Sequence, residues 1–452
     1  MIRKLLRRVF KRPANAIPTE PAIIPVDQHG VTSKQISSAA RKVCSVLQEK
    51  GHKAYVVGGA VRDIMAGQTP KDFDVATSAT PEEVKAAFRR SRIIGRRFRI
   101  VHVMSGPETI EVSTFRASQD AETAETDEHG RILRDNVFGS QAEDATRRDF
   151  TVNALYFDPT TETILDYHHG VADLKQKTLR MIGDVRTRYR EDPVRMLRAV
   201  RLGAKLGLSI DPAARGPIRE MSELLENVPP ARLFDEMLKL LLSGHAVNCL
   251  KQLREEGLHH GLLPLLDVIL EQPLGERFVW LSLDNTDQRV RQGKPVSPGF
   301  LFATLLWHEV LANWEARKAR GESVYPALFE AMDEVLDRQA GKLAITRRIV
   351  GDIKDIWALQ PRFERRNGKA PYRLIEQARY RAAWDFLRLR AESGEIDTSV
   401  PDWWNQFAHA NGTEREAMMH GGPADGAPRK RRRRRKRSAG AKSEDAPAGD
   451  AT

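Results

Sequence analysis

The fold is decided by two neighbouring stretches of sequence, Val57-Gly58-Gly59-Ala60-Val61-Arg62-Asp63 and Lys71-Asp72-Phe73-Asp74-Val75. In the first stretch, two glycines stand between a predicted strand and a predicted helix. Glycines let the backbone come close to a phosphate group, and the first turn of a helix offers it free N–H groups and a positive dipole. Gly58, Gly59 and Arg62 are therefore candidates for holding a triphosphate, although such a turn often needs glycine for its backbone geometry alone.

Asp72 and Asp74 carry the second signal. Side chains alternate along a strand, so both carboxylates point to one face while Phe73 and Val75 point into the core. Two like charges this close repel each other, and a divalent cation removes the repulsion while gaining hard oxygen ligands. The pair predicts a metal site, and its position shortly after the Gly-Gly turn favours that prediction over a chance pair of acidic residues.

A site for two metal ions needs a third carboxylate, and the sequence offers two candidates. Glu111 lies in a predicted strand, residues 109–115, on the face opposite Ile110 and Val112. Asp149 lies shortly before another predicted strand, residues 154–157. The residues alone favour neither candidate.

Arginine is dense in two places. One group surrounds the turn at Gly95 and comprises Arg89, Arg90, Arg92, Arg96, Arg97 and Arg99. In the other group, Arg195, Arg198 and Arg201 recur every three residues along a helix predicted to begin at Asp192. Such a helix can hydrogen-bond a base edge and clamp phosphates, although solvated helix charges are the alternative interpretation.

Composition and charge limit the class of protein. The 452 residues are 41% hydrophobic and 30% charged, which suits a soluble protein of two or more packed units followed by a tail. The net charge of +12 is concentrated at the ends, because residues 429–437 contribute +9 and six cations before Pro13 contribute +6, leaving −3 elsewhere. This distribution indicates local grooves for a polyanion rather than a uniformly basic surface. With two cysteines and no apolar run near ~20 residues, we expect a cytoplasmic protein without stable membrane insertion.

Hydrophobic spacing predicts the organisation of the chain. β-rich runs at 54–57, 73–76, 100–104, 109–115 and 154–157, with helices at 33–50 and 81–90, predict an α/β domain. After Gly183 the spacing is helical only. The predicted units are a basic N-terminal arm over 1–25, an α/β domain over 26–182, a helical neck over 183–245, a helical body and tail over 246–420, and a disordered Arg/Lys-rich C-terminus over 421–452.

Two further groups are given structural roles. The seven tryptophans lie mostly in helical patterns, so we expect them in the core rather than as platforms for bases. His168-His169 lacks partners at the spacing of metal ligands, and His259-His260 follows Gly257 like an ordinary helix end, so we do not expect metal sites there.

Four stretches together resemble the class II nucleotidyltransferases, the family of bacterial poly(A) polymerases and tRNA CCA-adding enzymes. They are residues 57–63, residues 71–74, Arg147-Arg148-Asp149-Phe150-Thr151-Val152-Asn153-Ala154-Leu155 and Glu191-Asp192-Pro193-Val194-Arg195-Met196-Leu197-Arg198. The resemblance implies a palm-like catalytic domain with a small mixed sheet, then all-α neck, body and tail regions that bind nucleotide and RNA. It also implies that Asp72 and Asp74 bind Mg²⁺ and that Asp149 is catalytic, which ranks Asp149 first as the third acid and keeps Glu111 as the rival candidate.

The resemblance further assigns the nucleotide contacts. Gly58, Gly59 and Arg62 would hold the triphosphate, and the incoming nucleotide would be contacted by Arg148, Asp192, Arg195 and Arg198. Two Mg²⁺ ions are expected to bridge the acidic patch and the ATP phosphates.

Flanking sequence favours the poly(A) polymerase branch of that family. Residues 94–103, the segment Gly106-Pro107-Glu108 and the basic C-terminal tail look like that branch, and a histidine-aspartate phosphohydrolase pattern is absent. The expected activity is template-independent transfer of AMP from ATP to RNA 3′ ends with release of pyrophosphate, with RNA-decay proteins as candidate partners. Two alternatives stay open, a tRNA CCA-adding enzyme and a non-catalytic RNA-binding protein on the same fold.

Overall fold

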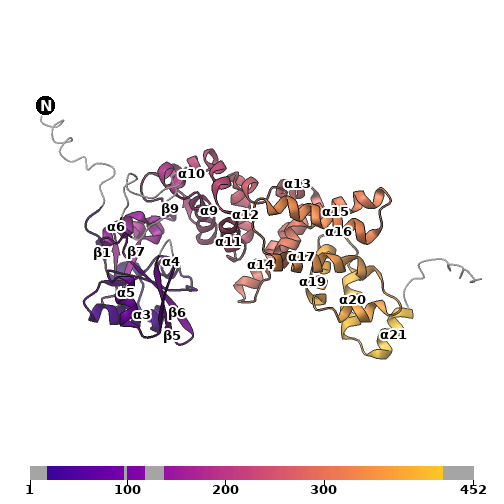
Figure 1. The fold of residues 1–452 in the computed structure, drawn as a ribbon, viewed down its shortest axis with the longest axis horizontal. Helices are drawn as coiled ribbons and strands as arrows, with labels where there is room; N and C mark the ends of the chain where they lie inside the picture. The colour runs from indigo at the N-terminus through magenta and orange to yellow at the C-terminus, as the bar shows by residue number, and fades with distance from the viewer. Residues whose placement is uncertain (1–17, 96–98, 118–136, 421–452) are drawn as a thin grey trace, which may run out of the picture.

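The structure, a computed structural model, describes residues 18–95, 99–117 and 137–420. The molecule is elongated, with an α/β head at one end and helices along the remainder (Figure 1). This arrangement confirms the predicted α/β domain followed by all-α regions. The predictions for most of the basic N-terminal arm, for Arg96 and Arg97, and for the C-terminus after His420 fall outside the described residues.

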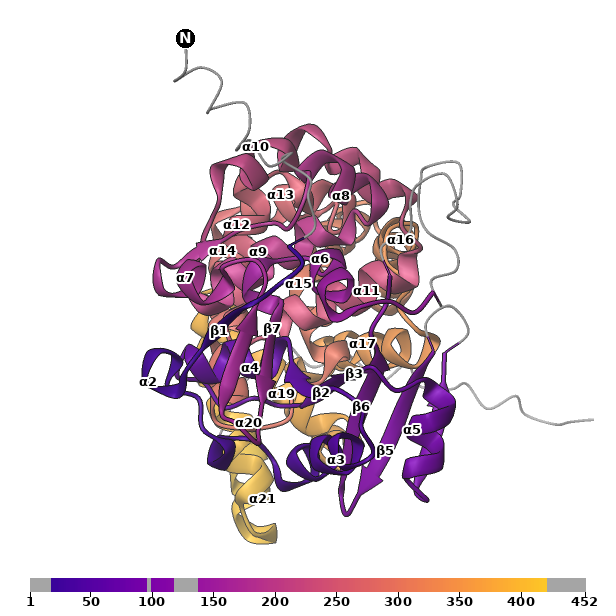
Figure 2. The ribbon, with the colours of Figure 1, turned by 90° about the vertical axis from the view of Figure 1, so that its left-hand side faces the viewer.

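A mixed sheet of eight strands forms the head (Figure 2). In chain order the strands are β1 (Ala22–Ile24), β2 (Ala54–Val57), β3 (Asp74–Thr77), β4 (Ser91–Ile94), β5 (Ile100–Ser105), β6 (Glu108–Thr114), β7 (Leu155–Asp158) and β8 (Thr163–Asp166). In space the order is β1-β8-β7-β2-β3-β6-β5-β4. β3 and β6 are parallel, and the other neighbouring strands are antiparallel. The chain between β3 and β6 forms α5, β4 and β5 before it returns to β3. The parallel pairing of β3 with β6 therefore brings Asp74 and Glu111 together, although they are separated in sequence.

Five strands, β2, β3, β5, β6 and β7, coincide with the predicted runs to within one residue at each end. β1, β4 and β8 were not predicted, because these short strands depend on partners that the sequence does not reveal: β1 pairs with β8, β4 with β5, and β8 with β7. β1 pairs with β8, the last strand of the head sheet in chain order, so the two strands are far apart in sequence but adjacent in the sheet. The sheet therefore begins at Ala22, inside the stretch predicted as a basic arm.

Helices cover the sheet. In the head they are α2 (Val26–His29), η1 (Ser33–Gln35), α3 (Ser38–Glu49), α4 (Gly59–Met65), α5 (Pro81–Ala87), α6 (Gln141–Arg147), η2 (Thr151–Asn153) and α7 (Gly170–Lys175), where η marks a 3-10 helix. α3 packs against β2, β3 and β6. It begins five residues later than predicted, because the Ser37 side chain accepts a hydrogen bond from the N–H of Ala40 and caps it.

α5 begins with a complete capping box. The Thr80 hydroxyl accepts from the N–H of Glu83, the Glu83 carboxylate accepts from the N–H of Thr80, and Pro81 stands in the first turn. The helix ends at Ala87 rather than at residue 90, because Phe88 is extended and leads into β4.

The remaining chain is helical apart from two short strands, β9 (Thr178–Leu179) and β10 (Ser209–Ile210), which pair in parallel. β10 lies beyond Gly183, so the prediction of helices only is wrong there, since a two-residue strand leaves no periodicity. The helices are α8 (Val185–Glu191), α9 (Val194–Leu206), α10 (Pro212–Glu220), η3 (Ser222–Asn227), α11 (Pro230–Leu241), α12 (Ala246–Glu255), η4 (Leu258–Gly261), α13 (Leu266–Leu270), α14 (Pro273–Arg291), α15 (Pro298–Ala319), α16 (Val324–Ala340), α17 (Arg347–Leu359), η5 (Gln360–Glu364), α18 (Ala370–Ile375), α19 (Tyr380–Glu392), α20 (Ser399–His409) and α21 (Gly412–His420).

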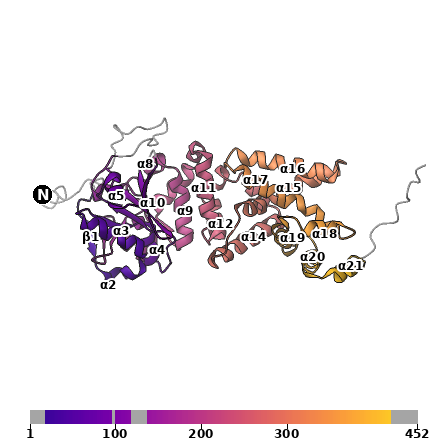
Figure 3. The ribbon, with the colours of Figure 1, turned by 60° about the horizontal axis from the view of Figure 1, so that its bottom comes forward.

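One continuous apolar core joins the head to the helices, running from Phe150 through Leu197 on α9 to Phe386 on α19. α15 lies at its centre against α14, α16 and α17, as expected for a helix that is apolar on all sides. A separate cluster around Trp404 and Phe407 holds α18 to α21 together at the far end (Figure 3). The head and the first helices therefore form one packed body on which the cleft described below is built.

The tryptophans divide into two groups. Four of them are buried, as predicted: Trp307, Trp314, Trp357 and Trp404. The other three are half-buried, each with a cation over its ring: Trp280, Trp384 and Trp403. Among the residues that the structure describes, none of the helices combines the length and the apolar character that a membrane crossing requires.

Candidate active site

One cleft of about 910 Å³ brings all ten predicted site residues together. The head contributes Gly58, Gly59, Arg62, Asp72, Asp74, Arg148 and Asp149, and the neck contributes Asp192, Arg195 and Arg198. Ten lysine and arginine side chains and six carboxylates line it, a balance that suits a polyanion. Four separate stretches of sequence therefore converge on one cavity between the sheet and helices α9 and α11.

The Gly-Gly turn joins β2 to α4 at the wall of the cleft. Gly58 has φ +71° and ψ −127°, a backbone conformation that side chains rarely adopt. A Cβ added there would also come within 3.4 Å of Arg148 Nη1. Gly59 begins α4, whose first N–H groups have no partner within the helix. The first glycine is required by the backbone, and the start of the helix lies where a phosphate would meet it.

Replacing Gly58 by Ala is expected to destabilise the fold by about 1–3 kcal/mol and to weaken ATP binding, because the strained turn would shift. Gly67→Ala is the matched control, since Gly67 has φ +72° but no atom within 4 Å of an added Cβ. Thermal unfolding and ATP titration of both variants check the prediction. An equal loss of ATP affinity in both variants would contradict it.

Arg62 stabilises this turn through hydrogen bonds to Asp63 and Asn153. Its side chain is 8% exposed, its Nε and Nη2 donate to Asp63 Oδ1 at 2.8 and 2.6 Å, and its Nη1 donates to Asn153 Oδ1 at 2.5 Å. Lys205 on α9 donates to the other oxygen of Asp63 at 2.8 Å. Arg62 thus lines the cleft while fixing α4 to the sheet, and Asp63 links α4 to the neck.

Asp74 and Glu111 lie directly beside each other. The parallel register of β3 and β6 pairs Asp74 with Glu111, so both side chains share one face of the sheet. Asp72 precedes β3, and the predicted alternation holds, with Asp72 and Asp74 exposed and Val75 buried. Glu111 is positioned by His102, its cross-strand neighbour on β5, whose Nε2 lies 3.2 Å from Glu111 Oε1.

The acidic patch of Asp72, Asp74 and Glu111 has the chemistry of a site for a hard cation. Desolvation by the cleft walls raises the pKa of Asp74 to about 6, and the charges of Glu111 and Asp72 add to this effect against the opposing charge of Arg148. Like charges held together on one sheet face are relieved by a divalent cation with a preference for oxygen ligands. The residues present therefore fit Mg²⁺.

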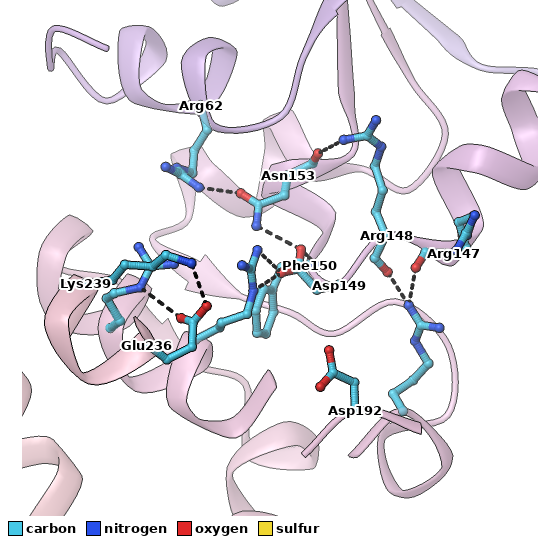
Figure 4. Close-up of polar contacts among 12 residues, drawn as sticks. Arg62, Arg147, Arg148, Asp149, Phe150, Asn153, Asp192, Glu236 and Lys239 are labelled. Carbon is cyan, nitrogen blue, oxygen red and sulfur yellow. Dashed lines mark hydrogen bonds and ion pairs between the residues drawn. The ribbon is translucent and has the colours of Figure 1, made fainter. Parts of the chain in front are cut away.

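Asp149 differs from these acids because both of its oxygens already accept hydrogen bonds. Oδ1 accepts from the N–H of Phe150 and from Asn153 Nδ2, at 2.8 and 2.9 Å, and Oδ2 pairs with Arg198 at 2.6 Å (Figure 4). Burial alone would raise the pKa of Asp149, but Arg198, Asn153 and the Phe150 amide hold it well below its usual range. The Asp149–Arg198 pair ties the head to α9.

Asn153 connects the predicted residues to one another (Figure 4). Its side-chain oxygen accepts from Arg62, its amide group donates to Asp149, and its backbone oxygen accepts from Arg148 Nη1 at 3.4 Å. The sequence analysis did not single out this residue, although it stands in the motif that contains Asp149. An asparagine can make these contacts because it offers both donors and an acceptor.

Asp192 bounds the cleft on the neck side. Its Oδ2 accepts from Arg232 Nη2 at 2.8 Å, whereas its Oδ1 is buried without a hydrogen-bond partner. The sequence predicted that α9 begins at Asp192, and this prediction is wrong. Asp192 is the C-cap of α8, Pro193 is the N-cap of α9, and α9 begins at Val194. Arg195 is engaged, since its Nη1 donates to Glu191 and to the backbone oxygen of Arg188. Of this pair, Asp192 keeps an acceptor atom for a ligand.

The contribution of α11 to the cleft was not predicted from the sequence. This helix places Arg232, Glu236 and Lys239 in the wall of the cleft, four and three residues apart and thus on one face. Glu236 Oε2 and Arg201 Nε are buried without hydrogen-bond partners and lie 4.0 Å apart. The spacing of the charges was visible in the sequence, but which face of the helix meets the cleft was not.

A tight group of metal-ligating types lies outside the cleft. His259, His260 and Asp267 have potential ligand atoms within 4.8 Å of one another, and among the described residues no other trio is that compact. These two histidines were predicted from the sequence to mark an ordinary helix end after Gly257, and Asp267, on α13, was not considered as their partner. Arg254 Nε also lies 3.3 Å from Asp267, so a cation already neutralises this carboxylate.

Comparisons with known proteins show which family the chain resembles. The poly A polymerase head domain matches residues 54–180, the probable RNA and SrmB-binding site of polymerase A matches residues 207–270, and the polymerase A arginine-rich C-terminus matches residues 320–438. Poly(A) polymerase I of Salmonella typhi is 44% identical over 443 residues, which cover 95% of each chain.

The CCA-adding enzymes are less similar in sequence. The CCA-adding enzyme of Bacillus velezensis is 35% identical over 54% of this chain and 60% of its own length. The crystal structure of the Bacillus stearothermophilus CCA-adding enzyme in complex with CTP shares the fold, with a TM-score of 0.55 and 25% identity over 84% of this chain and 81% of that one. From its motifs, its fold and its full-length similarity, the chain belongs to the family of bacterial poly(A) polymerases.

Proposed function

We propose that this protein transfers AMP from ATP to the 3′ hydroxyl of RNA without a template and releases pyrophosphate. The observation that carries the proposal is the arrangement of one cleft, in which Asp72, Asp74 and the Gly-Gly turn face the cationic helix α9 and two cations of α11, Arg232 and Lys239. Glu111 adjoins Asp74 in a neighbouring pocket. A triphosphate can lie at the start of α4 while its α-phosphate stays within reach of the acidic patch. Action in the cytoplasm suits Cys44 and Cys249, both of which are buried free thiols.

The proposal is tested by incubating the protein with unstructured RNA and each of the four nucleotides separately, followed by gel electrophoresis. ATP alone should give long homopolymers. Incorporation of CTP that stops once a tRNA end is complete would favour the CCA-adding alternative. Binding of RNA without any extension would favour a non-catalytic RNA-binding protein.

We assign Mg²⁺, in a pair of ions, to Asp72, Asp74 and Glu111. When bound, the metal would lower the pKa of the RNA 3′ hydroxyl and stabilise the charge of the leaving pyrophosphate. Glu111 is favoured over Asp149 as the third carboxylate, because it adjoins Asp74 in register and Asp149 is saturated with hydrogen bonds. Asp149 then acts as a positioning residue that holds Arg198 at the cleft.

Replacing Glu111 by Gln is expected to weaken the apparent affinity for Mg²⁺ by at least about 10- to 100-fold. Added Mg²⁺ should restore part of the activity in this variant, whereas it should not restore an Asp149→Asn variant. Activity is measured across a Mg²⁺ titration, with Glu108→Gln on the same strand as the control. Rescue of Asp149→Asn but not of Glu111→Gln would reverse the assignment.

Nucleotide selection is assigned to Asp192. Its unpartnered Oδ1 can accept a hydrogen bond from the exocyclic amino group of a base, which adenine and cytosine possess and uracil lacks. This contact discriminates against UTP, and the distinction between ATP and CTP must come from other atoms of the cleft. Arg232 holds the carboxylate in place through its other oxygen.

The Asp192→Ala variant should lose about 1–3 kcal/mol of discrimination, which is a roughly ten- to hundredfold fall in the ratio of kcat/KM for ATP over UTP. Competition between labelled nucleotides on one primer measures this ratio. Asp235→Ala, which removes a carboxylate from the same region without removing a cleft residue, serves as the control. A ratio unchanged by Asp192→Ala would remove this residue from base recognition.

A further inference from the structure

Five cations lie close together in sequence at the far end of the helical region. We call them the cationic patch; they lie on η5, on α18 and on the turn between these helices, and comprise Arg362, Arg365, Arg366, Lys369 and Arg373. Four of them are exposed and Arg366 is half-buried. Within the part of the chain that the structure describes, none of the five forms an ion pair. Glu364 is the single acidic residue in the same stretch, 361–373.

The arginines that follow in the chain are treated differently. On and just before α19 each of them is paired with a carboxylate: Arg379 with Asp352, Arg381 with Asp385, Arg388 with Glu392 and Arg390 with Glu395. These four arginines are therefore neutralised within the fold, whereas the five cations of the patch are not. Five neighbouring charges left without counter-charges repel one another, so the cationic patch is suited to an anionic ligand.

Aromatic rings lie beneath two of these cations. The Arg365 guanidinium lies 5.7 Å from the ring centre of Tyr325 on α16, and the Arg366 guanidinium lies 5.6 Å from that of Trp403 on α20. Both rings are half-buried. Trp403 also stacks on the buried Phe407, with centroids 4.9 Å apart, so its position is fixed by the tail core.

The combination of charges and rings distinguishes among polyanions. Single-stranded RNA offers phosphates to the arginines and unpaired bases that stack on aromatic rings. Base-paired RNA hides the faces of its bases, and an acidic protein segment has no planar groups for the two rings. The pKa of Asp397 is lowered by hydrogen bonds from Ser399 and, to a smaller extent, by the charge of Arg366. Among the described residues, Asp397 nevertheless forms no ion pair with the patch.

We propose that the cationic patch binds single-stranded RNA upstream of the 3′ end that is being extended. The inference rests on the proposed function, because it assumes an RNA whose 3′ end occupies the cleft. The patch lies at the opposite end of the long axis from the head, as the position of α18 beside α20 and α21 shows (Figure 3). A long RNA reaches both places, whereas a short primer reaches the cleft only. The patch thus favours long RNAs and holds them between additions.

The test compares the full-length wild type with the variant R365Q/R366Q/K369Q. The matched control is K318Q/R320Q/K354Q, which removes three cations of the helical region, one exposed and two half-buried, that are paired with Glu315, Glu322 and Asp333. Affinity for a short and a long oligo(A) is measured across a salt series, and circular dichroism verifies that each variant is folded. Extension of the short oligo(A) at saturating concentration is measured in parallel.

For the long RNA, the slope of log affinity against log salt should fall by about 2 in the patch variant, at roughly 0.7 for each lost phosphate contact on a single strand. The control should keep the wild-type slope. Extension of the short oligo(A) should be unchanged in both. A Tyr325→Leu variant should weaken binding of the long RNA about tenfold, because a stacking surface is lost.

Three results would overturn the inference. The first is an equal slope in the patch variant and the control, which would favour an acidic protein partner for the patch. The second is competition by long duplex RNA that equals that of single-stranded RNA. The third is a loss of affinity for the short oligo(A) as large as that for the long one. A wild-type protein that binds RNA but extends none refutes the proposed function instead, and the salt slopes still decide the role of the patch.

Discussion

Replacing Asp72 and Asp74 together by Asn is expected to reduce RNA extension by at least about a thousandfold while RNA still binds. The metal contributes several kcal/mol of charge stabilisation in the transition state, and the neutral amides remove most of its ligand charge. Affinity for RNA should stay the same or rise slightly, because two negative charges leave a cleft in which cations are in excess. Single-turnover extension and equilibrium RNA binding measure the two effects separately.

The control for this experiment removes the same charge elsewhere. Asp337 and Asp355 are exposed, lie outside the cleft and form no ion pair with a described residue, so their replacement by Asn should affect neither measurement. Extension that survives in the variant lacking Asp72 and Asp74 would refute the mechanism. A parallel loss of RNA binding would instead place these carboxylates in the structure of the RNA site.

Replacing Asp149 by Asn should have the largest effect on stability. Arg198 would lose its partner while its side chain is only 33% exposed, so we expect a loss of about 2–3 kcal/mol, which allows for partial solvation of the arginine. Extension should also fall, because Arg198 would no longer be held at the cleft. Denaturant unfolding and primer extension check both results.

The pH dependence and a double-mutant cycle give this prediction its controls. The pKa of Asp149 is lower in the folded than in the unfolded protein, so its stabilising contribution is present above the unfolded value of about 4 and is lost as pH falls below it. The Asp149→Asn variant should lack this part of the acid sensitivity. Adding Arg198→Gln should cost less than its separate effect, because the pair is already broken. Strict additivity of the two changes would contradict a direct pairing.

Local patterns were sufficient to predict much of the head and of the site. Alternation in the strand that contains Asp74 gave its orientation, and the glycine pair located the turn before α4. The capping box of Thr80 and Glu83 at the start of α5 is likewise a local property. These features depend on residues that are close in sequence, which is why the sequence alone specifies them.

Contacts between distant segments set the limit of what could be predicted. Spacing and alternation alone favoured neither Glu111 nor Asp149, and only the family resemblance ranked Asp149 first, because the proximity of Glu111 to Asp74 depends on the parallel pairing of β3 with β6. The role of Asn153 depends on where Arg62 lies, one motif away in the chain. The same reason explains the missed strand β1, which is stable only beside β8.

The sequence also did not determine which neighbours the side chains on one face of a helix contact. Arg195, Arg198 and Arg201 were predicted as one cationic face, but each has a different environment. Arg195 pairs with Glu191, Arg198 pairs with Asp149, and Arg201 has a buried Nε without a hydrogen bond. Spacing placed these arginines on one side of α9, and only the packing of the helix against the head and α11 distinguishes them.

The most direct test of the central claim is the stoichiometry of the reaction on a defined RNA. The RNA is supplied with either a 3′-hydroxyl or a 3′-deoxy end, together with ATP and Mg²⁺, and pyrophosphate release and AMP incorporation are both counted. We predict one pyrophosphate for each AMP added to the 3′-hydroxyl RNA, and neither product with the 3′-deoxy RNA or after chelation of the metal. Release of pyrophosphate without incorporation, or extension of the 3′-deoxy RNA, would contradict the account.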